Sequence, residues 1–197
     1  ATIAVAANFK PAMQELEAAF EKAGGRDLVI VAGSTGKLAA QIANGAPFDI
    51  FLAADAAHPQ YLAEKRLAGD APFTYAIGRL VLWAPGQTKI DGSVLAGREI
   101  GRIAIANPKL APYGAAAAEA ISKLPESGAI ESKLVYGENI GQTFAFIETG
   151  AASAGFIALS QFLTLPEEMR AAFWTPPQSL YEPIRQDAVL LSRAAGN

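Results

Sequence analysis

The stretch at residues 28–55 constrains the fold more than any other part of this 197-residue sequence. It begins with an apolar run at 28–31 and passes through a short turn into a helical pattern at 37–44, which glycine and proline then stop. This order predicts a buried strand that leads into a helix, with Ser34 and Thr35 at the helix start. A helix start has about four unpartnered backbone N–H groups and roughly half a positive charge, so it can hold an anion without a lysine.

The first residues of the chain repeat the strand-to-helix order. Residues 2–6 are predicted to form an apolar strand, and Asn8 is the expected N-cap of the helix that follows. The helical spacing of Met13, Leu16 and Phe20 predicts that these three side chains form its buried stripe.

A third strand is expected at 48–54, and Asp55 is the expected cap of a helix at 56–67. Three strands separated by helices predict a mainly parallel sheet with helical crossovers. The second half repeats the pattern, and two further segments are expected to be extended, an apolar one at 75–84 and one at 182–191. We therefore predict an α/β fold of two lobes, each a mainly parallel sheet flanked by helices, in which the two extended segments cross between lobes.

The predicted lobe boundaries are residues 1–79 with 186–197 for the first lobe, and residues 80–185 for the second. Ligands of parallel sheets bind beyond the carboxyl ends of the strands. Four loops lie at such ends, and each opens a helix: Ala7-Asn8, Ser34-Thr35, Pro112-Tyr113 and Asn139-Ile140.

These loops offer mainly hydrogen-bond donors: backbone N–H groups, an amide, two hydroxyls and a phenol. A fully ionised tetrahedral oxyanion suits such a site because it presents only acceptors. Phosphate near neutral pH keeps a proton and needs a carboxylate acceptor, and a proton that faces donors costs about 1–3 kcal/mol. The one obvious carboxylate at these loops is Glu138, directly before Asn139. The pattern therefore favours a sulfate-like anion over phosphate.

The composition excludes several classes of function. A formal net charge of -3 argues against a nucleic-acid surface. The absence of cysteine excludes disulfides and cysteine-ligated metals. No apolar run approaches the ~20 residues that span a bilayer, and the chain starts as a processed, mature chain would, without a signal peptide. The single histidine, His58, makes neither a metal site nor a catalytic triad and is expected at the surface.

Two other interpretations of the loop residues stay open at this point. Ser34, Thr35 and Asn8 have the side chains most often found at helix caps, so capping alone could explain them. An α/β enzyme could instead use Ser34 as a nucleophile, which would require a nearby base.

Several motifs make the chain similar to the periplasmic molybdate- and tungstate-binding proteins of ABC importers. The resemblance covers nearly the whole chain, in order. The motifs are Ala6-Ala7-Asn8-Phe9, Gly33-Ser34-Thr35-Gly36, residues 41–49, Phe51-Leu52-Ala53-Ala54-Asp55, residues 73–83, Asn107-Pro108, Ala111-Pro112-Tyr113-Gly114 and Tyr181-Glu182-Pro183-Ile184.

The resemblance implies a two-lobed clamp that holds its ligand by neutral donors. The implied ligand positions fall on Asn8 with Ala7 beside it, and on Thr35 with Ser34 beside it. In the second lobe they fall on Tyr113 and on Ile140, which would donate its backbone N–H. Some members of the family place a tyrosine at the position of Ala158, so Tyr113 alone is expected to supply the phenol.

The implied function is high-affinity capture of molybdate or tungstate in the periplasm for delivery to an ABC permease, by a monomer that has no cofactor and catalyses no reaction. Neither nucleic acid nor membrane insertion is expected. A binder of sulfate or another tetrahedral oxyanion is the alternative. Family members continue past Leu191 with a helical segment that packs on the first lobe, whereas this sequence ends at Asn197.

Overall fold

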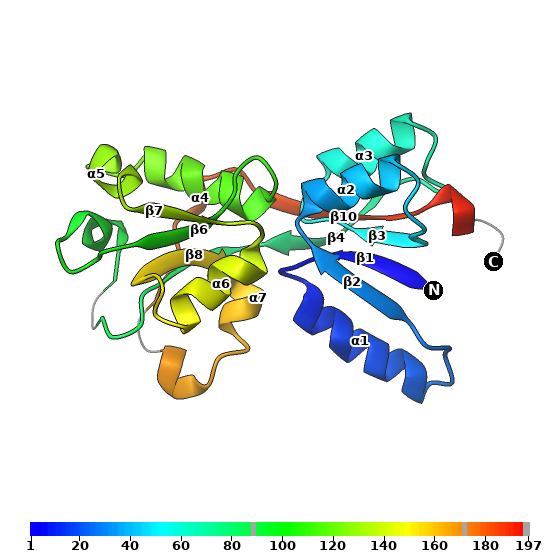
Figure 1. The fold of residues 1–197 in the computed structure, drawn as a ribbon, viewed down its shortest axis with the longest axis horizontal. Helices are drawn as coiled ribbons and strands as arrows, with labels where there is room; N and C mark the ends of the chain where they lie inside the picture. Colours follow the sequence, from blue (N-terminus) through cyan, green and yellow to red (C-terminus); the bar gives the residue numbers. More distant parts are fainter. Residues whose placement is uncertain (88–89, 171–172, 195–197) are drawn as a thin grey trace. The chain divides into compact units, whose positions relative to one another are not determined.

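The computed structural model describes residues 1–87, 90–170 and 173–194. These residues divide into two compact units, one formed by residues 1–77 and the chain from Arg185 onward, the other by residues 78–184. Each unit contains a five-stranded sheet flanked by helices (Figure 1). The predicted α/β fold of two lobes, each a sheet flanked by helices, is confirmed, while the exact lobe boundaries given above stay a prediction.

The sheet of the first unit has the order β2-β1-β3-β10-β4. Strand β1 is parallel to β2 and β3, and β10 is antiparallel to β3. Helices α2 and α3 cover one face of this sheet and α1 covers the other (Figure 1). The bounds are β1 (Thr2–Ala6), α1 (Lys10–Lys22), β2 (Val29–Gly33), α2 (Thr35–Ala43), β3 (Ile50–Leu52), α3 (Ala57–Glu64), β4 (Phe73–Gly78), β10 (Ile184–Leu190) and the 3-10 turn η4 (Ser192–Ala194).

The two faces of this sheet differ in how well they are covered. Leu38, Phe51 and Leu62 belong to a buried cluster on the α2–α3 face. On the α1 face, Met13 packs against Ile3 and Val5 of β1.

The predicted buried stripe of α1 is wrong beyond its first turn. Only Met13 is buried, whereas Leu16 is 53% exposed and Phe20 is 47% exposed. The ring of Phe20 lies against the backbone of Gly25, just past the helix, instead of reaching the sheet. The expected burial of the 28–31 run is also wrong, because β2 is an edge strand and leaves Val29 exposed.

The sheet of the second unit has the order β7-β6-β8-β5-β9, with β6 parallel to β7 and β8, and β5 antiparallel to β8 and β9. Helix α4 covers one face, and α6 and α7 cover the other (Figure 1). The bounds are β5 (Leu80–Trp83), η1 (Gly92–Ala96), β6 (Ile103–Ala106), α4 (Pro112–Ser122), α5 (Ser127–Glu131), β7 (Leu134–Gly137), α6 (Ile140–Glu148), β8 (Ala154–Ala158), α7 (Leu159–Phe162), η2 (Glu167–Arg170), β9 (Phe173–Trp174) and η3 (Gln178–Leu180).

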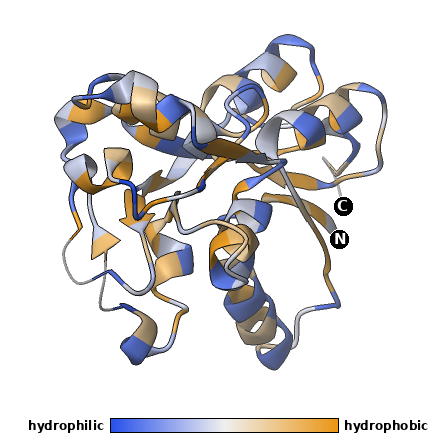
Figure 2. Ribbon diagram, turned by 60° about the vertical axis from the view of Figure 1, so that its left-hand side comes forward, coloured by the Kyte–Doolittle hydropathy of each residue, from blue (hydrophilic) through white to orange (hydrophobic). Residues whose placement is uncertain are grey.

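The segment at 75–84, predicted as one long strand, is two strands in different sheets. Strand β4 ends at Gly78 in the first sheet, and β5 begins at Leu80 in the second. All of β5 is buried, and Trp83 lies in the core with its indole N–H donated to the Met169 carbonyl at 3.1 Å. In Figure 2 the helices carry both hydrophilic and hydrophobic residues, as is typical of helices that cover a sheet on one side.

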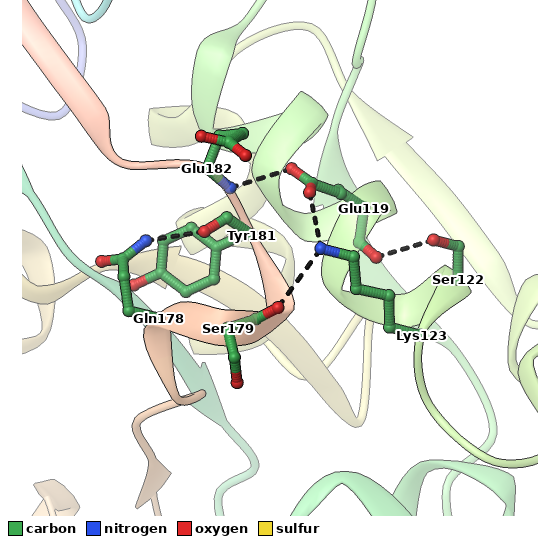
Figure 3. A network of polar contacts seen from close by, with 7 residues as sticks. All are labelled: Glu119, Ser122, Lys123, Gln178, Ser179, Tyr181 and Glu182. Atoms are coloured by element: carbon green, nitrogen blue, oxygen red, sulfur yellow. Dashed lines mark hydrogen bonds and ion pairs between the residues drawn. The ribbon is translucent and has the colours of Figure 1, made fainter.

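A polar network ties α4 to the segment that leads into β10 (Figure 3). The Glu119 carboxylate accepts hydrogen bonds from Lys123 Nζ at 2.8 Å and from the Glu182 N–H at 3.0 Å. Lys123 also donates to the Ser179 carbonyl. The hydrogen bond from Lys123, followed by that from Glu182, lowers the pKa of Glu119. The segment before β10 is therefore anchored within the second unit.

No helix in the described ranges is long and apolar enough to cross a membrane.

Candidate oxyanion site

In the first unit, two predicted ligand loops lie side by side at the carboxyl edge of the sheet. Ala6 at the end of β1 pairs in register with Gly33 at the end of β2. The Ala7 N–H donates to the Gly33 carbonyl at 3.0 Å, which fixes the turn after β1 against the turn that opens α2. The N–H of Ala7 is therefore already used within the protein, and its side chain carries no donor.

Ser34 lies at the N-cap of α2, where its backbone is extended, yet its side chain makes no capping hydrogen bond. The residue is 2% exposed. Its Oγ atom has no hydrogen-bond partner among the described residues. A buried hydroxyl without a partner costs about 1–3 kcal/mol, so capping does not explain this serine.

Thr35, the first residue of α2, is buried, and its Oγ1 accepts the backbone N–H of Ala54 at 3.0 Å. A hydroxyl oxygen that accepts a backbone N–H keeps its own hydrogen to donate. Ala54 follows β3, so this bond fixes the hydroxyl between the ends of two strands. Thr35 is thus an oriented donor at the positive end of a nine-residue helix.

Asn8 does not cap α1, which corrects the prediction. The N-cap position belongs to Phe9, without any side-chain capping bond. The side-chain amide of Asn8 is buried and donates from Nδ2 to Gln186 Oε1 at 2.8 Å. Tyr75 donates from its hydroxyl to the Ala53 carbonyl at 2.9 Å, and its oxygen lies 3.3 Å from the same Gln186 Oε1. The orientation of Asn8 is therefore set by tertiary contacts and not by the helix.

In the second unit, Tyr113 lies within the first turn of α4, because the helix begins at Pro112. Tyr113 is buried. Gly114 beside it has no room for a side chain, since a Cβ atom there would meet the Ala106 carbonyl at the end of β6. The close approach holds the first turn of α4 against the carboxyl end of the strand.

Ile140 is the first residue of α6, which follows β7, the parallel neighbour of β6. Asn139 at the N-cap accepts the N–H groups of Gly141 at 2.9 Å and Gln142 at 3.0 Å. Within the described ranges, no protein group accepts the N–H of Ile140. One backbone donor at this helix start is therefore left for a ligand, at the residue that the family resemblance implies.

Two acidic residues of the first unit, Asp49 and Asp55, have structural roles. Asp49 accepts the N–H of Thr2 at 2.7 Å. Asp55 precedes α3, accepts the His58 N–H at 2.9 Å and contacts His58 Nδ1 at 2.7 Å. Asp55 therefore accepts an N–H of the first turn of α3, but the N-cap position is Ala56 and not the predicted Asp55. The hydrogen bond to Asp55 raises the pKa of His58, against the opposing effect of burial.

Sequence patterns did not indicate the groups that orient these donors. The buried polar and charged residues in the described part of the chain are Asn8, Ser34, Thr35, Thr143, Gln161, Gln186 and Asp187. The first three are predicted ligand residues. Gln186 bonds to Asn8, and Gln161 and Thr143 bond to the peptide groups around Ile140. A buried glutamine far along the chain has no local sequence signature, so only tertiary structure reveals it.

No group of three or more His, Asp or Glu residues that could hold a metal ion occurs among the residues with described positions. The candidate donors are thus uncharged groups near helix starts: Asn8, Ser34 and Thr35 in the first unit, and Tyr113 and Ile140 in the second. Ala7 lies beside Asn8, but its N–H is already bonded to Gly33.

Comparison with known proteins identifies relatives over the whole chain. Residues 1–197 match the family model described as bacterial extracellular solute-binding protein. The chain is 45% identical to the molybdate-binding protein ModA of Azotobacter vinelandii, over 99% of this chain and 79% of that protein. It is 43% identical to ModA of Rhodobacter capsulatus, over 98% and 76%. The solved periplasmic molybdate-binding protein of A. vinelandii superposes with a TM-score of 0.91 at 38% identity, covering 99% of this chain and 87% of that one.

Proposed function

Because the chain belongs to the bacterial extracellular solute-binding protein family, we propose that it binds molybdate or tungstate in the periplasm and delivers the anion to an ABC permease. The curated relatives described above are molybdate-binding proteins, which supports this choice of ligand. In this proposal the protein acts as a monomer, uses no cofactor and carries out no reaction.

The observation that carries the proposal is the buried hydroxyl of Ser34. It lies at the N-terminus of α2 without a hydrogen-bond partner among the described residues. An anion at the helix start would accept this hydroxyl together with the first free backbone N–H groups of the helix. The ligand would thereby remove the cost of the buried, unsatisfied group.

The donor set favours a tetrahedral anion without protons. The Thr35 hydroxyl is oriented to donate by the Ala54 N–H, and backbone N–H groups can only donate. Glu138, the one acidic residue in the four loops, is exposed. A protonated phosphate would find no buried carboxylate acceptor in this set, whereas molybdate, tungstate and sulfate present only acceptors.

We propose that Asn8 is a further ligand donor of the first unit, and that Tyr113 and the Ile140 N–H are the ligand donors of the second. The free Ile140 N–H supports this part of the proposal, because a helix start whose next two N–H groups are capped by Asn139 retains one donor for a ligand. The side chain of Ile140 then matters little.

We propose binding without catalysis by Ser34. A serine nucleophile needs a base within hydrogen-bond reach to take its proton. Ser34 Oγ forms no hydrogen bond with any described residue, and the imidazole of His58 is hydrogen-bonded to Asp55. The geometry therefore supplies no activating base.

Calorimetric titration with sodium molybdate tests the proposal, followed by competition with sulfate and with phosphate. We expect tight 1:1 binding of molybdate that phosphate does not displace. Displacement by sulfate at comparable concentration would identify the protein as a general binder of tetrahedral oxyanions. The proposal would be overturned if molybdate gave no heat of binding and no competition between the three anions could be detected.

A further inference from the structure

We propose that Thr143 and Gln161 are positioning residues that aim the Ile140 N–H at the bound anion. This inference rests on the proposed function and adds to it two residues that do not touch the ligand. Both side chains are polar and buried, Thr143 in α6 and Gln161 in α7.

Thr143 fixes the peptide group that carries the donor. The carbonyl of Asn139 and the N–H of Ile140 belong to one planar trans peptide, so they point in opposite directions. The Asn139 carbonyl accepts the Thr143 N–H at 3.1 Å and the Thr143 Oγ1 hydroxyl at 3.0 Å. Two bonds on the carbonyl side therefore set the direction of the N–H on the other side.

Gln161 fixes the next peptide group. Its Nε2 donates to the Ile140 carbonyl at 3.0 Å, and its Oε1 accepts the Ala158 N–H at 3.1 Å. The side chain thus bridges the end of β8 and the first residue of α6, which are far apart in sequence. With the peptides on both sides of Ile140 held, its backbone cannot rotate without breaking buried hydrogen bonds.

Gly137 makes this arrangement possible. A Cβ atom at Gly137 would lie 2.6 Å from Thr143 Oγ1 and 2.8 Å from the Thr143 backbone nitrogen. The glycine therefore lets the end of β7 approach the first turn of α6 closely enough for Thr143 to reach back to Asn139.

The Thr143 hydroxyl could have the same geometry if it only stabilised α6. A second threonine of the same helix serves as the control for this alternative. Thr149 donates from Oγ1 to the Ala145 carbonyl at 2.7 Å, the same bond to the fourth preceding residue, at the opposite end of α6 and exposed. Thr143→Val and Thr149→Val each remove one such bond from one helix. Only the first lies beside the proposed donor.

The experiment compares wild type, Thr143→Val, Thr143→Ser and Thr149→Val by molybdate calorimetry, with urea unfolding and the Ile140 amide resonance as further readouts. We expect Thr143→Val to bind about fivefold to tenfold more weakly and to show a smaller shift of the Ile140 amide proton on molybdate addition. Thr143→Ser and Thr149→Val should stay within about twofold of wild type.

If folded Thr143→Val keeps the molybdate affinity and the Ile140 amide shift of wild type, the inference is overturned. The proposed function would still stand in that case, because wild type binds molybdate. Equal weakening in Thr149→Val would also overturn it, because the effect would then belong to the whole helix. If Thr143→Val fails to fold, Gln161→Met decides in its place by the same affinity and amide readouts. Wild type that does not bind molybdate would overturn the proposed function and this inference with it.

Discussion

Helices α2 and α6 have the same length and the same place in their units, since each follows a parallel strand and spans nine residues. Their N-caps differ. Asn139 caps α6 with two hydrogen bonds from its side chain, whereas Ser34 at the N-cap of α2 makes none and keeps a buried hydroxyl without a partner in the described structure. Two good capping residues at equivalent positions therefore have different roles, one structural and one available for a ligand.

The starts of α2 and α6 also differ in the kind of hydrogen-bond donor that they offer to a ligand. The first unit presents side-chain donors, of which Thr35 is oriented by one backbone N–H. At the start of α6, the second unit instead offers the backbone N–H of Ile140, with the peptide groups on both sides of Ile140 held by buried side chains. The predictions below test whether these two helix starts differ in the way the structure indicates.

The largest effect is expected from Thr35→Ala. The change removes a charge-assisted hydrogen bond, which contributes about 1.5–3 kcal/mol, and also leaves the Ala54 N–H without its acceptor. Molybdate affinity should fall ten- to a hundredfold, as measured by calorimetry. Thr35→Ser keeps the hydroxyl and should bind nearly as wild type does. Wild-type affinity in both Thr35→Ala and Tyr113→Phe would remove the site assignment.

Ser34→Ala should have the next largest effect, of about tenfold on molybdate affinity, because one donor to the anion is lost. Stability without ligand should stay equal or rise, since the substitution removes a buried hydroxyl that has no partner in the described chain. Urea unfolding in the absence of oxyanions measures this. A clear loss of stability with full affinity would show that Ser34 is a cap after all.

Asn139→Ala should show the opposite pattern. Loss of the cap should lower the free energy of unfolding by about 1 kcal/mol, because the N–H groups of Gly141 and Gln142 lose their acceptor. Molybdate affinity should change less than in Ser34→Ala. The contrast between α2 and α6 breaks down if the two variants prove alike in both measurements.

The smallest effect concerns pH. The bond to Asp55 raises the folded-state pKa of His58 above its ordinary value of about 6.5. The resulting stabilisation is fully present below that ordinary value and is lost as pH rises through the higher folded-state pKa. Urea unfolding of wild type and His58→Asn should be measured at increasing pH across this range. The free energy of unfolding should fall slightly more in wild type than in the variant. An identical pH profile in both proteins would contradict this role.

The sequence was sufficient to predict the α/β fold with a sheet in each half, because strand-to-helix transitions repeat along the chain and local patterns specify them. It failed where tertiary contacts decide. The spacing of Leu16 and Phe20 fits a buried stripe, but α1 buries little beyond Met13. The segment at 75–84 fits one apolar strand except at Gly78 and Arg79, and the change of sheet occurs at these two residues.

The candidate site was predictable only in part, for a similar reason. Capping residues at helix starts can be recognised locally, and the family resemblance selects among them. Whether Ser34 caps or binds depends on atoms that surround it in space. The buried side chains that orient the donors, Gln161 and Gln186, lie far along the chain from the residues they contact.

Elemental analysis of the purified protein tests the central claim most directly, that uncharged donors at helix starts hold an oxyanion without a proton. The protein is exposed to equal concentrations of molybdate, tungstate, sulfate and phosphate, freed of unbound anion by gel filtration, and measured by mass spectrometry. The account predicts about one molybdenum or tungsten atom per chain and no phosphorus. Bound phosphorus, or no bound oxyanion at all, would contradict it.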